Sequence, residues 1–368
     1  MENSAQPRLS VFTYTVVWRL PYSVWHEEVT GMIGAIFRCL IVFALCLLPQ
    51  TAFGRSAMDA SAPDSAPGIS WQTHGQLTFP FEYFKQHIYI SVTLDGKPGY
   101  IFMLDSGANR NVLNLRTARK LGIQSGKLRQ ERNVGFGDGP IYTASRQYVD
   151  AEMDSIPIAS EMSVMDLNQF ELHFSHPTDG ILGFPFLQRF VVKLDFQRKL
   201  LSMFPARQYV YRGLGVRVHL ESRRGFVVIP VIIGSSRYVN HQAKVIVDTG
   251  SNVTLMLYEH YVHELNLESS LMHARAGKAY GLNGYYAVDL GSIHSLQIGD
   301  AEAHNVPVDY MQPGEEIHPG RDNVGSIGNG ILQSFQAVIF DVPHRQIILE
   351  VKPPQLEPGD VRTKTNGP

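Results

Sequence analysis

The stretch "KVIVDTGSNVTLM" (residues 244–256) decides the fold, because an apolar run typical of a β-strand ends at Asp248 and a Thr-Gly-Ser turn follows. Asp and Gly are ordinary turn residues, so a single Asp-Thr-Gly is compatible with a strand-closing turn as well as with a reactive carboxylate. A second copy, "GYIFMLDSGANRNVLN" (99–114), aligns with the first and places Asp105 on Asp248, 143 positions earlier. The two aspartates therefore have to be interpreted together.

A second pair of matching blocks shows that the repeat covers most of the chain. "DGILGFPFLQRFVVKLDFQRKLL" (179–201) aligns with "VGSIGNGILQSFQAVIFDVPHRQIIL" (324–349), with Gly183 on Gly328. The four blocks occur in the same order and at nearly the same spacing, which is the signature of an internal duplication. We expect an N-terminal domain at 71–206 and a C-terminal domain at 207–352.

Each copy has the same order of expected elements. A strand pair leads to the Asp turn, and in the first copy it turns at Asp95-Gly96. A short helix follows, at 115–123 in one copy and 257–267 in the other. A Gly-rich hairpin comes next, and the copy closes with a strand pair in which Asp195 and Asp341 are interpreted as turn residues. Frequent Gly and Pro between short apolar runs predict a β-rich protein.

The N-terminus is interpreted as a targeting segment. "CLIVFALCLLP" (39–49) is too short to span a bilayer, which needs about 20 helical residues. Residues 1–54 are therefore predicted to be a signal peptide with an extended n-region, and Met32 is an alternative start. This predicts export to the periplasm or the extracellular space. Retention as a membrane anchor through residues 32–54 is the alternative. A linker at 55–70 follows, and residues 353–368 are expected to be a disordered tail.

Composition narrows the possible chemistry and partners. The formal net charge is -2 and no basic stripe occurs, which argues against nucleic acid as a partner. Both cysteines, Cys39 and Cys46, lie in the apolar N-terminal segment, so the mature chain would have no thiol for catalysis or zinc binding. His260 and His263 share a helical face, which we interpret as an exposed surface, since no third metal ligand is evident. We expect no metal or other cofactor.

Two aspartates at equivalent positions of a duplicated domain imply a specific chemistry. If the halves pack around a pseudo-two-fold axis near those turns, the carboxyl groups meet, and like charges in contact cannot both ionise readily. The pair then shares one proton. One carboxylate can activate a water while the other group protonates the developing oxyanion or the leaving amine. Such a pair could hydrolyse an amide without a metal or a covalent intermediate.

The ordered combination of apolar run, Asp-Ser/Thr-Gly-Ala/Ser, Gly-rich hairpin and Ile-Leu-Gly or Ser-Ile-Gly resembles the pepsin and retropepsin clan of aspartic proteases. The resemblance implies an all-β fold with short helices, made of two pseudo-symmetric acid-protease β-barrel domains. It implies that Asp105 and Asp248 are the catalytic pair of an endopeptidase that cleaves a peptide or protein substrate. The turns that support the pair would comprise Ser106, Gly107, Ala108, Thr249, Gly250 and Ser251.

The resemblance also implies two Gly-rich flaps, at 133–144 and 279–288, that close over an extended peptide. Their candidate residues are Gly135, Gly137, Gly139, Tyr142, Gly281, Gly284 and Tyr285. Strands containing Gly183 and Gly328 would pass behind the two Asp turns. The fourth turn position is Ala108 in one half and Ser251 in the other, and only a hydroxyl can stabilise an ionised carboxylate there. This asymmetry predicts a pH optimum from mildly acidic to near neutral.

Three alternatives stay open at this level. The Asp turns could be purely structural features of a duplicated β-domain. A chain with one competent half could need homodimerisation to supply the second aspartate, although we expect a monomer with an intrachain pair. A non-catalytic protein could keep the cleft and bind peptides without cleaving them.

Overall fold

The structure is a computed structural model that describes residues 75–124, 126–127, 129–131, 140–236, 238–264, 267, 274–312 and 323–351. The predicted signal peptide, linker and C-terminal tail lie outside the described residues, as do Gly135, Gly137 and Gly139. Within the described part of the chain, no helix is long and apolar enough to cross a membrane.

The first half forms a closed β-barrel. Its sheet has the order β2-β3-β4-β9-β5-β8-β7-β6, and an additional pairing of β3 with β7 closes six of the strands into a barrel. The hairpin between β3 and β4 turns at Asp95 (φ 45°) and Gly96 (φ 75°), as predicted from the sequence. The strands are β2 (Glu82–Phe84), β3 (His87–Leu94), β4 (Lys97–Leu104), β5 (Val112–Asn114), β6 (Arg129–Glu131), β7 (Ile141–Met153), β8 (Ile156–Met165) and β9 (Gly180–Leu182).

The second half repeats this arrangement. Its sheet has the order β13-β14-β15-β20-β16-β19-β18-β17, and the pairing of β14 with β18 closes it. The strands are β13 (Glu221–Arg223), β14 (Phe226–Ser236), β15 (Val239–Asp248), β16 (Leu255–Leu257), β17 (Arg275–Gly281), β18 (Gly284–Ile298), β19 (Ala301–Met311) and β20 (Gly325–Gly328). Corresponding strands occupy the same places in the two sheets, so the internal duplication in the sequence is also a duplication of topology.

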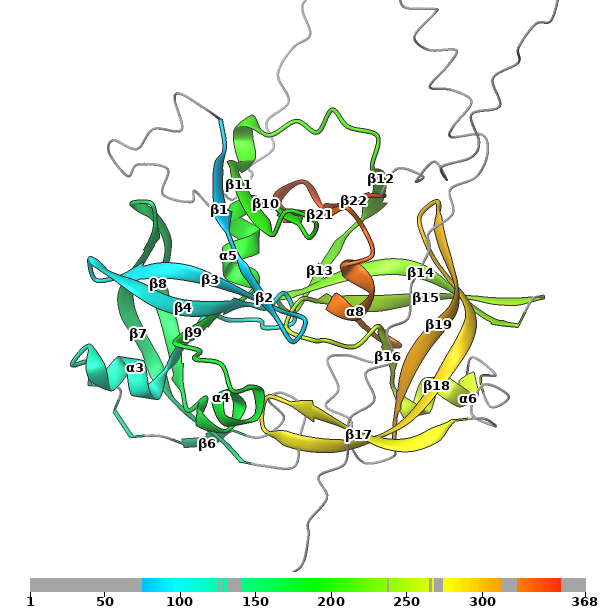
Figure 1. Cartoon of the computed structure of the whole chain (residues 1–368), viewed down its shortest axis with the longest axis horizontal. Helices are drawn as coiled ribbons and strands as arrows, with labels where there is room; N and C mark the ends of the chain where they lie inside the picture. The colour runs from blue at the N-terminus through cyan, green and yellow to red at the C-terminus, as the bar shows by residue number, and fades with distance from the viewer. Residues whose placement is uncertain are drawn as a thin grey trace, which may run out of the picture.

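A third sheet joins the two halves. Its order is β1-β11-β10-β21-β22-β12, and antiparallel pairing of β10 with β21 at its centre brings Val192 opposite Phe340. Three of these strands precede residue 207 and three follow it, so each half contributes one side of the sheet (Figure 1). The strands are β1 (Leu77–Pro80), β10 (Phe190–Asp195), β11 (Leu200–Pro205), β12 (Val216–His219), β21 (Ala337–Asp341) and β22 (Gln346–Glu350).

Helices are short and connect the strands. Helix α3 begins where the Asn114 side chain accepts a hydrogen bond from Arg116 N, a normal N-cap. Helices α3 and α6 lie within the expected stretches 115–123 and 257–267. The helical elements are α3 (Leu115–Lys120), α4 (Asn168–Phe174), α5 (Phe184–Arg189), α6 (Glu259–Glu264), α8 (Asn329–Leu332) and the 3₁₀ turns η1 (Ala206–Gln208) and η2 (Val342–His344).

The mainly-β fold with two barrel units is confirmed. The expected limits of the two domains stay a prediction. The boundary at 206/207 falls within η1, on the segment between β11 and β12. One large core runs through both barrels and includes Phe102 of the first half and Phe340 of the second, each fully buried. The two barrels therefore share one hydrophobic core.

Candidate active site

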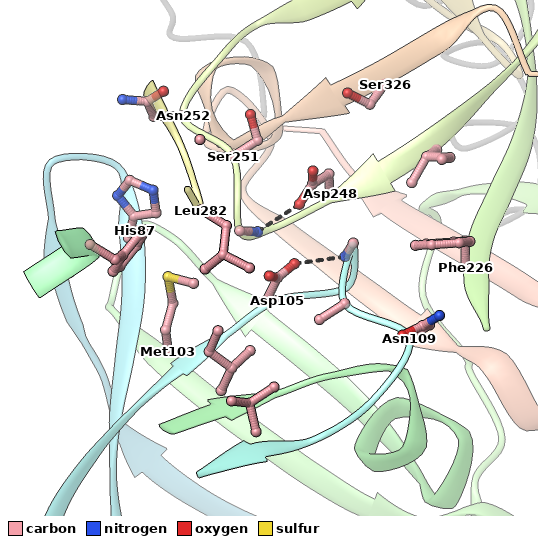
Figure 2. A pocket seen from close by; sticks show the side chains of 18 of the residues that line it. His87, Met103, Asp105, Asn109, Phe226, Asp248, Ser251, Asn252, Leu282 and Ser326 are labelled. Carbon is pink, nitrogen blue, oxygen red and sulfur yellow. Dashed lines mark hydrogen bonds between the residues drawn. The ribbon is translucent and has the colours of Figure 1, made fainter. Parts of the chain in front are cut away.

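The two Asp turns lie between the barrels, each at the end of a central strand. Asp105 follows β4, and Asp248 is the last residue of β15. Gly107 N donates to Asp105 Oδ1 at 2.8 Å, and Gly250 N donates to Asp248 Oδ1 at 2.9 Å. Figure 2 shows both bonds as dashed lines, with the two carboxyl groups close to each other. Each turn thus holds its carboxyl group in place through its own backbone.

Four reciprocal hydrogen bonds lock the two turns together beneath the carboxyl groups. Ser106 N donates to Thr249 Oγ1, and Thr249 N donates to Ser106 Oγ, each at 2.9 Å. The hydroxyls then donate further: Ser106 Oγ to Val247 O at 2.6 Å and Thr249 Oγ1 to Leu104 O at 2.9 Å. Both side chains are fully buried. This interlock fixes the position of one Asp turn relative to the other.

Glycine is required beside each carboxyl group. A Cβ atom at Gly107 would lie 2.5 Å from Asp248 Cγ, and one at Gly250 would overlap the Asp105 carboxyl group. Neither position could therefore hold a larger residue without pushing the opposite aspartate away. Each turn glycine leaves the space in which the aspartate of the other half sits.

The protonation of the pair follows from this closeness. Burial raises the pKa of Asp105 well above its usual range, and the charge of Asp248 together with a hydrogen bond between the two groups raises it further. Burial also raises the pKa of Asp248, but the hydrogen bonds from Asp105 and Gly250 N oppose that rise. The pair as a unit therefore holds one proton to a higher pH than an isolated carboxyl group would.

A parallel strand supports each turn from behind. Leu182 of β9 pairs with Leu104, and Gly328 of β20 pairs with Asp248. A Cβ atom at Gly183 or Gly328 would collide with backbone oxygens of the adjacent Asp turn, which explains why both copies have glycine. Asn329 adds a link between the halves, because its Nδ2 donates to Thr249 O at 2.6 Å and to Gln86 O at 2.7 Å.

Asp105 and Asp248 open onto a cleft with a cavity volume of about 360 Å³. One part of its wall is apolar and aromatic, formed by residues such as Met103, Phe170 and Phe174. Gly107, Ala108, Gly250 and Ser251 of the predicted turns also line it. The cleft therefore combines two adjacent carboxyl groups with apolar walls, which is a composition typical of ligand-binding sites.

The hairpin of β17 and β18 reaches across to the other half at one end of this cleft. The Tyr280 ring stacks on His173 of α4 with centroids 3.5 Å apart, and its hydroxyl donates to Gln169 O at 3.1 Å. Tyr285 contributes a hydroxyl 3.5 Å from His173 Nδ1. Burial and the charge of Lys85 lower the pKa of His173. Figure 1 shows the end of β17 beside α4.

The remaining predicted flap residues differ in their placement. Gly281 lines the cleft, whereas Gly284 and Tyr285 lie beyond the tip of the same hairpin on β18. Tyr142 lies on β7 and is 41% exposed, outside the cleft lining.

Sequence reasoning missed several cleft residues. Tyr280 is not among the predicted flap residues, and the aromatic residues of α4 have no counterpart in the second copy to reveal them. His87, at the start of β3, is a further one. Burial lowers its pKa to about 4, although the adjacent backbone of Lys85 and Gly250 partly offsets this effect. Its imidazole is therefore neutral at ordinary pH.

A comparison with known protein families identifies the family of the chain. A family model described as aspartyl protease matches residues 90–186 and 230–347, which is more than half of the chain and includes both Asp turns. The chain belongs to the aspartyl protease family and is a hydrolase of the aspartic type. An aspartic proteinase from Irpex lacteus is structurally similar, with 11% identity, a TM-score of 0.45, and coverage of 75% of this chain and 97% of that one. A search of curated proteins found no match.

Proposed function

We propose that the protein is an aspartic endopeptidase in which Asp105 and Asp248 of one chain form the catalytic pair. The observation that carries this proposal is the four-bond interlock of Ser106 and Thr249, which holds the two carboxyl groups against each other at the floor of the cleft. A purely structural role would not explain this arrangement. Two adjacent, buried carboxyl groups destabilise each other when both are ionised, so their pairing is unfavourable for the fold.

The proposed reaction needs one protonated and one ionised group in the pair, and we assign the proton to Asp105 and the charge to Asp248. Asp248, as the carboxylate, takes a proton from a water molecule, and the resulting hydroxide attacks the peptide carbonyl carbon. Asp105, which holds its proton because of its raised pKa, gives that proton to the carbonyl oxygen. The tetrahedral intermediate then collapses: Asp248 passes its proton to the leaving nitrogen, and Asp105 recovers one from the intermediate. One water is consumed, and a carboxyl and an amino product are released.

The hairpin of β17 and β18 is proposed to act as a flap over the bound peptide. Gly281 and Leu282 at its tip line the cleft, and Tyr280 anchors it to α4 of the other half. A hairpin in this position excludes water from the cleft and strengthens the electrostatic interactions within it. The corresponding hairpin of the first half, at 133–144, is proposed by analogy within the duplication.

The substrate is proposed to be a peptide or an unfolded protein segment, bound by a monomer. Export to the periplasm or beyond belongs to the same proposal, and its support is the N-terminal sequence alone.

A peptide-library digest tests the proposed activity. The mature chain, with and without a pepstatin-type inhibitor, is incubated with a library of defined peptides between about pH 3 and about pH 8, and new termini are identified by mass spectrometry. We expect internal cleavages that the inhibitor abolishes and that Asp105→Asn does not produce. Peptide binding without cleavage at any pH would instead identify a non-catalytic binding protein.

A further inference from the structure

We propose that the cleft selects peptides that carry an aromatic or large apolar side chain on one side of the scissile bond and an acidic side chain on the other. This inference rests on the proposed function, because it concerns the same cleft. Figure 2 shows the two directions: His87, Met103 and Leu282 lie on one side of the aspartate pair, and Asn109 and Phe226 lie on the opposite side. We call the side with His87, Met103 and Leu282 the apolar end. We call the side with Asn109 and Phe226 the basic end, because the cleft-lining residues Arg110 and Arg224 lie within two positions of them in the sequence.

The duplication allows the two ends to be compared position by position. Tyr89 pairs with Met103 and Val228 pairs with Ile246, each two residues before an aspartate. Counting back four residues from Tyr89 and Val228 places Lys85 and Arg224 at equivalent turn positions, with φ of 45° and 52°. The two cations have different surroundings. Lys85 Nζ donates to Phe174 O at 2.9 Å, outside the cleft lining, whereas the exposed Arg224 lines the cleft.

A second arginine reaches the basic end from the other half. Arg110 lies five residues after Asp105 and lines the cleft, whereas the equivalent residue after Asp248 is Val253. The two segments touch, since a Cβ atom at Gly225 would lie 2.9 Å from Asn109 Cβ. Arg110 and Arg224 therefore converge on one end of the cleft, and the opposite end has an uncharged residue in place of Arg110.

The basic character continues beyond the cleft. Asn109 and Arg110 also line an adjoining cavity of about 250 Å³, to which Arg146 and Arg189 contribute. Glu161, which pairs with Arg146 at 3.4 Å, is the acidic residue of that lining. The described lining of the two cavities thus places four arginines at this end against one glutamate. A peptide leaving the cleft in this direction would pass these arginine side chains.

The floor of the basic end is also more polar than that of the apolar end. Ser326 of β20 and Ile181 of β9 occupy equivalent positions, each two residues before the glycine, Gly328 or Gly183, that lies against the Asp turn. Both residues line the cleft. Ser326 is 3% exposed, and among the described residues its hydroxyl has no hydrogen-bond partner. A buried hydroxyl without a partner is unfavourable unless a ligand satisfies it. This end is thus suited to a polar group, and the other end to a hydrocarbon.

An acidic side chain matches this arrangement best. Guanidinium groups bind carboxylates through two parallel hydrogen bonds, and two arginines from different halves can approach the same group. The attraction also offsets the repulsion between an acidic substrate and the aspartate pair, which carries one negative charge when it shares a proton.

The test combines cleavage profiling with binding. The peptide-library digest is repeated with wild type, Arg224→Gln and Arg110→Gln, and with Arg212→Gln as the control. Arg212 is exposed on the segment between the halves, outside the cleft lining, so its loss changes the net charge equally.

We expect the cleaved peptides to be enriched in Glu or Asp on the side of the scissile bond opposite the aromatic preference. We also expect about fivefold higher kcat/KM for a Glu peptide than for its Gln counterpart, as for a partly exposed ion pair. Either cleft variant should reduce that ratio to about twofold or less, and Arg212→Gln should leave it unchanged.

Binding separates failure of this inference from failure of the proposed catalysis. The same Glu and Gln peptides are titrated against Asp248→Asn by fluorescence anisotropy. Tighter binding of the Glu peptide that is lost in Asp248→Asn/Arg224→Gln supports the polarised cleft even if wild type cleaves nothing. Cleavage without any acidic preference, or a preference that Arg212→Gln reduces as much as Arg224→Gln, overturns the inference while the endopeptidase proposal stands.

Discussion

The hydroxyl groups of Ser106 and Thr249 each satisfy two backbone groups of the opposite half, and neither side chain is accessible to water. Replacing one of them leaves buried donors and acceptors without partners. Such groups cost about 1–3 kcal/mol each, more than the net value of the hydrogen bonds themselves. The interlock is therefore expected to contribute to folding stability as well as to the placement of the carboxyl groups.

Thr249→Ala should lower the free energy of unfolding by about 2–4 kcal/mol, because Ser106 N and Leu104 O lose their partner. Thr249→Ser keeps the hydroxyl and loses one methyl group, so about 1 kcal/mol is expected. Urea denaturation followed by fluorescence measures both. Equal losses for the two variants would show that the hydroxyl bonds do not stabilise the turns.

The aspartate pair predicts the pH dependence of cleavage. In the proposed mechanism the active form holds one proton. Burial together with the charge of Asp248 raises the pKa of Asp105, so that proton is retained to higher pH. Activity should therefore fall on the acid side when Asp248 is protonated and on the alkaline side when Asp105 loses its proton. We expect kcat/KM to be maximal from mildly acidic to near-neutral pH. A pH–rate profile that peaks below about pH 3 would contradict this.

Asp309 of β19 predicts a pH effect on stability. Burial raises its pKa to about 6, above the value of about 3.9 in an unfolded chain. The folded state binds more protons between these values, so stability should decrease as pH rises from about 4 to about 6. Asp309→Asn should remove this loss and be more stable than wild type at about pH 7.5 by about 1–2 kcal/mol.

Denaturation at about pH 4 and about pH 7.5 measures the Asp309 effect, with Asp300→Asn at the exposed turn before β19 as the control. An Asp309→Asn protein whose stability changes with pH as much as that of wild type would show that the group is not responsible.

Much of the site at the residue scale could be predicted because it occurs twice. The Asp-Ser/Thr-Gly turns and the later glycines were recognisable since the same backbone constraints select the same residues in both copies. Arg110, Arg224 and Ser326 escaped prediction for the opposite reason. Each differs from its counterpart in the other half, and a difference between copies shows no pattern in the sequence alone.

At the scale of elements, the hairpin of β17 and β18 is held against α4 by an aromatic contact between the two halves. Stacked aromatic pairs contribute about 0.5–1.5 kcal/mol beyond the area they bury. If the hairpin acts as a flap, this contact determines how much of the protein is in the closed arrangement before a peptide binds.

His173→Ala should raise KM for a peptide substrate by about two- to tenfold with a smaller effect on kcat, since the closed hairpin loses its anchor. His173→Phe keeps a ring for Tyr280 and should recover most of the loss. Leu172→Ala on the same helix is the control, because Leu172 is 73% exposed. An unchanged KM in His173→Ala would show that the contact does not position the hairpin.

The strand order within each copy could be predicted from apolar runs and turn residues. The contact between His173 of α4 and Tyr280 of the β17–β18 hairpin could not. Helix α4 precedes the Ile-Leu-Gly block of the first copy without a described equivalent in the second, and nothing local indicates that His173 meets Tyr280 more than 100 residues later. Expected flap residues Gly135, Gly137 and Gly139 lie outside the described residues, so their role stays a prediction.

At the scale of the whole molecule, the two halves share a six-stranded sheet in addition to the cleft. Pairing of β10 with β21 and the Asn329 contacts to both Asp-bearing halves tie them together within one chain. Sequence analysis found the duplication but not this sheet, because the final strand pair of each copy has the same apolar pattern whether it pairs within or between halves. The arrangement supports an intrachain catalytic pair.

Complementation between inactive variants tests the central claim most directly. Asp105→Asn and Asp248→Asn are purified separately, shown to be folded and monomeric, and assayed on one cleavable peptide alone and as an equimolar mixture. Each variant alone should lose at least about 10³-fold in kcat. The mixture should be as inactive as its components, because no chain then contains both aspartates. Recovery of activity on mixing would place the pair between chains, and full activity of either single variant would contradict the Asp105/Asp248 pair itself.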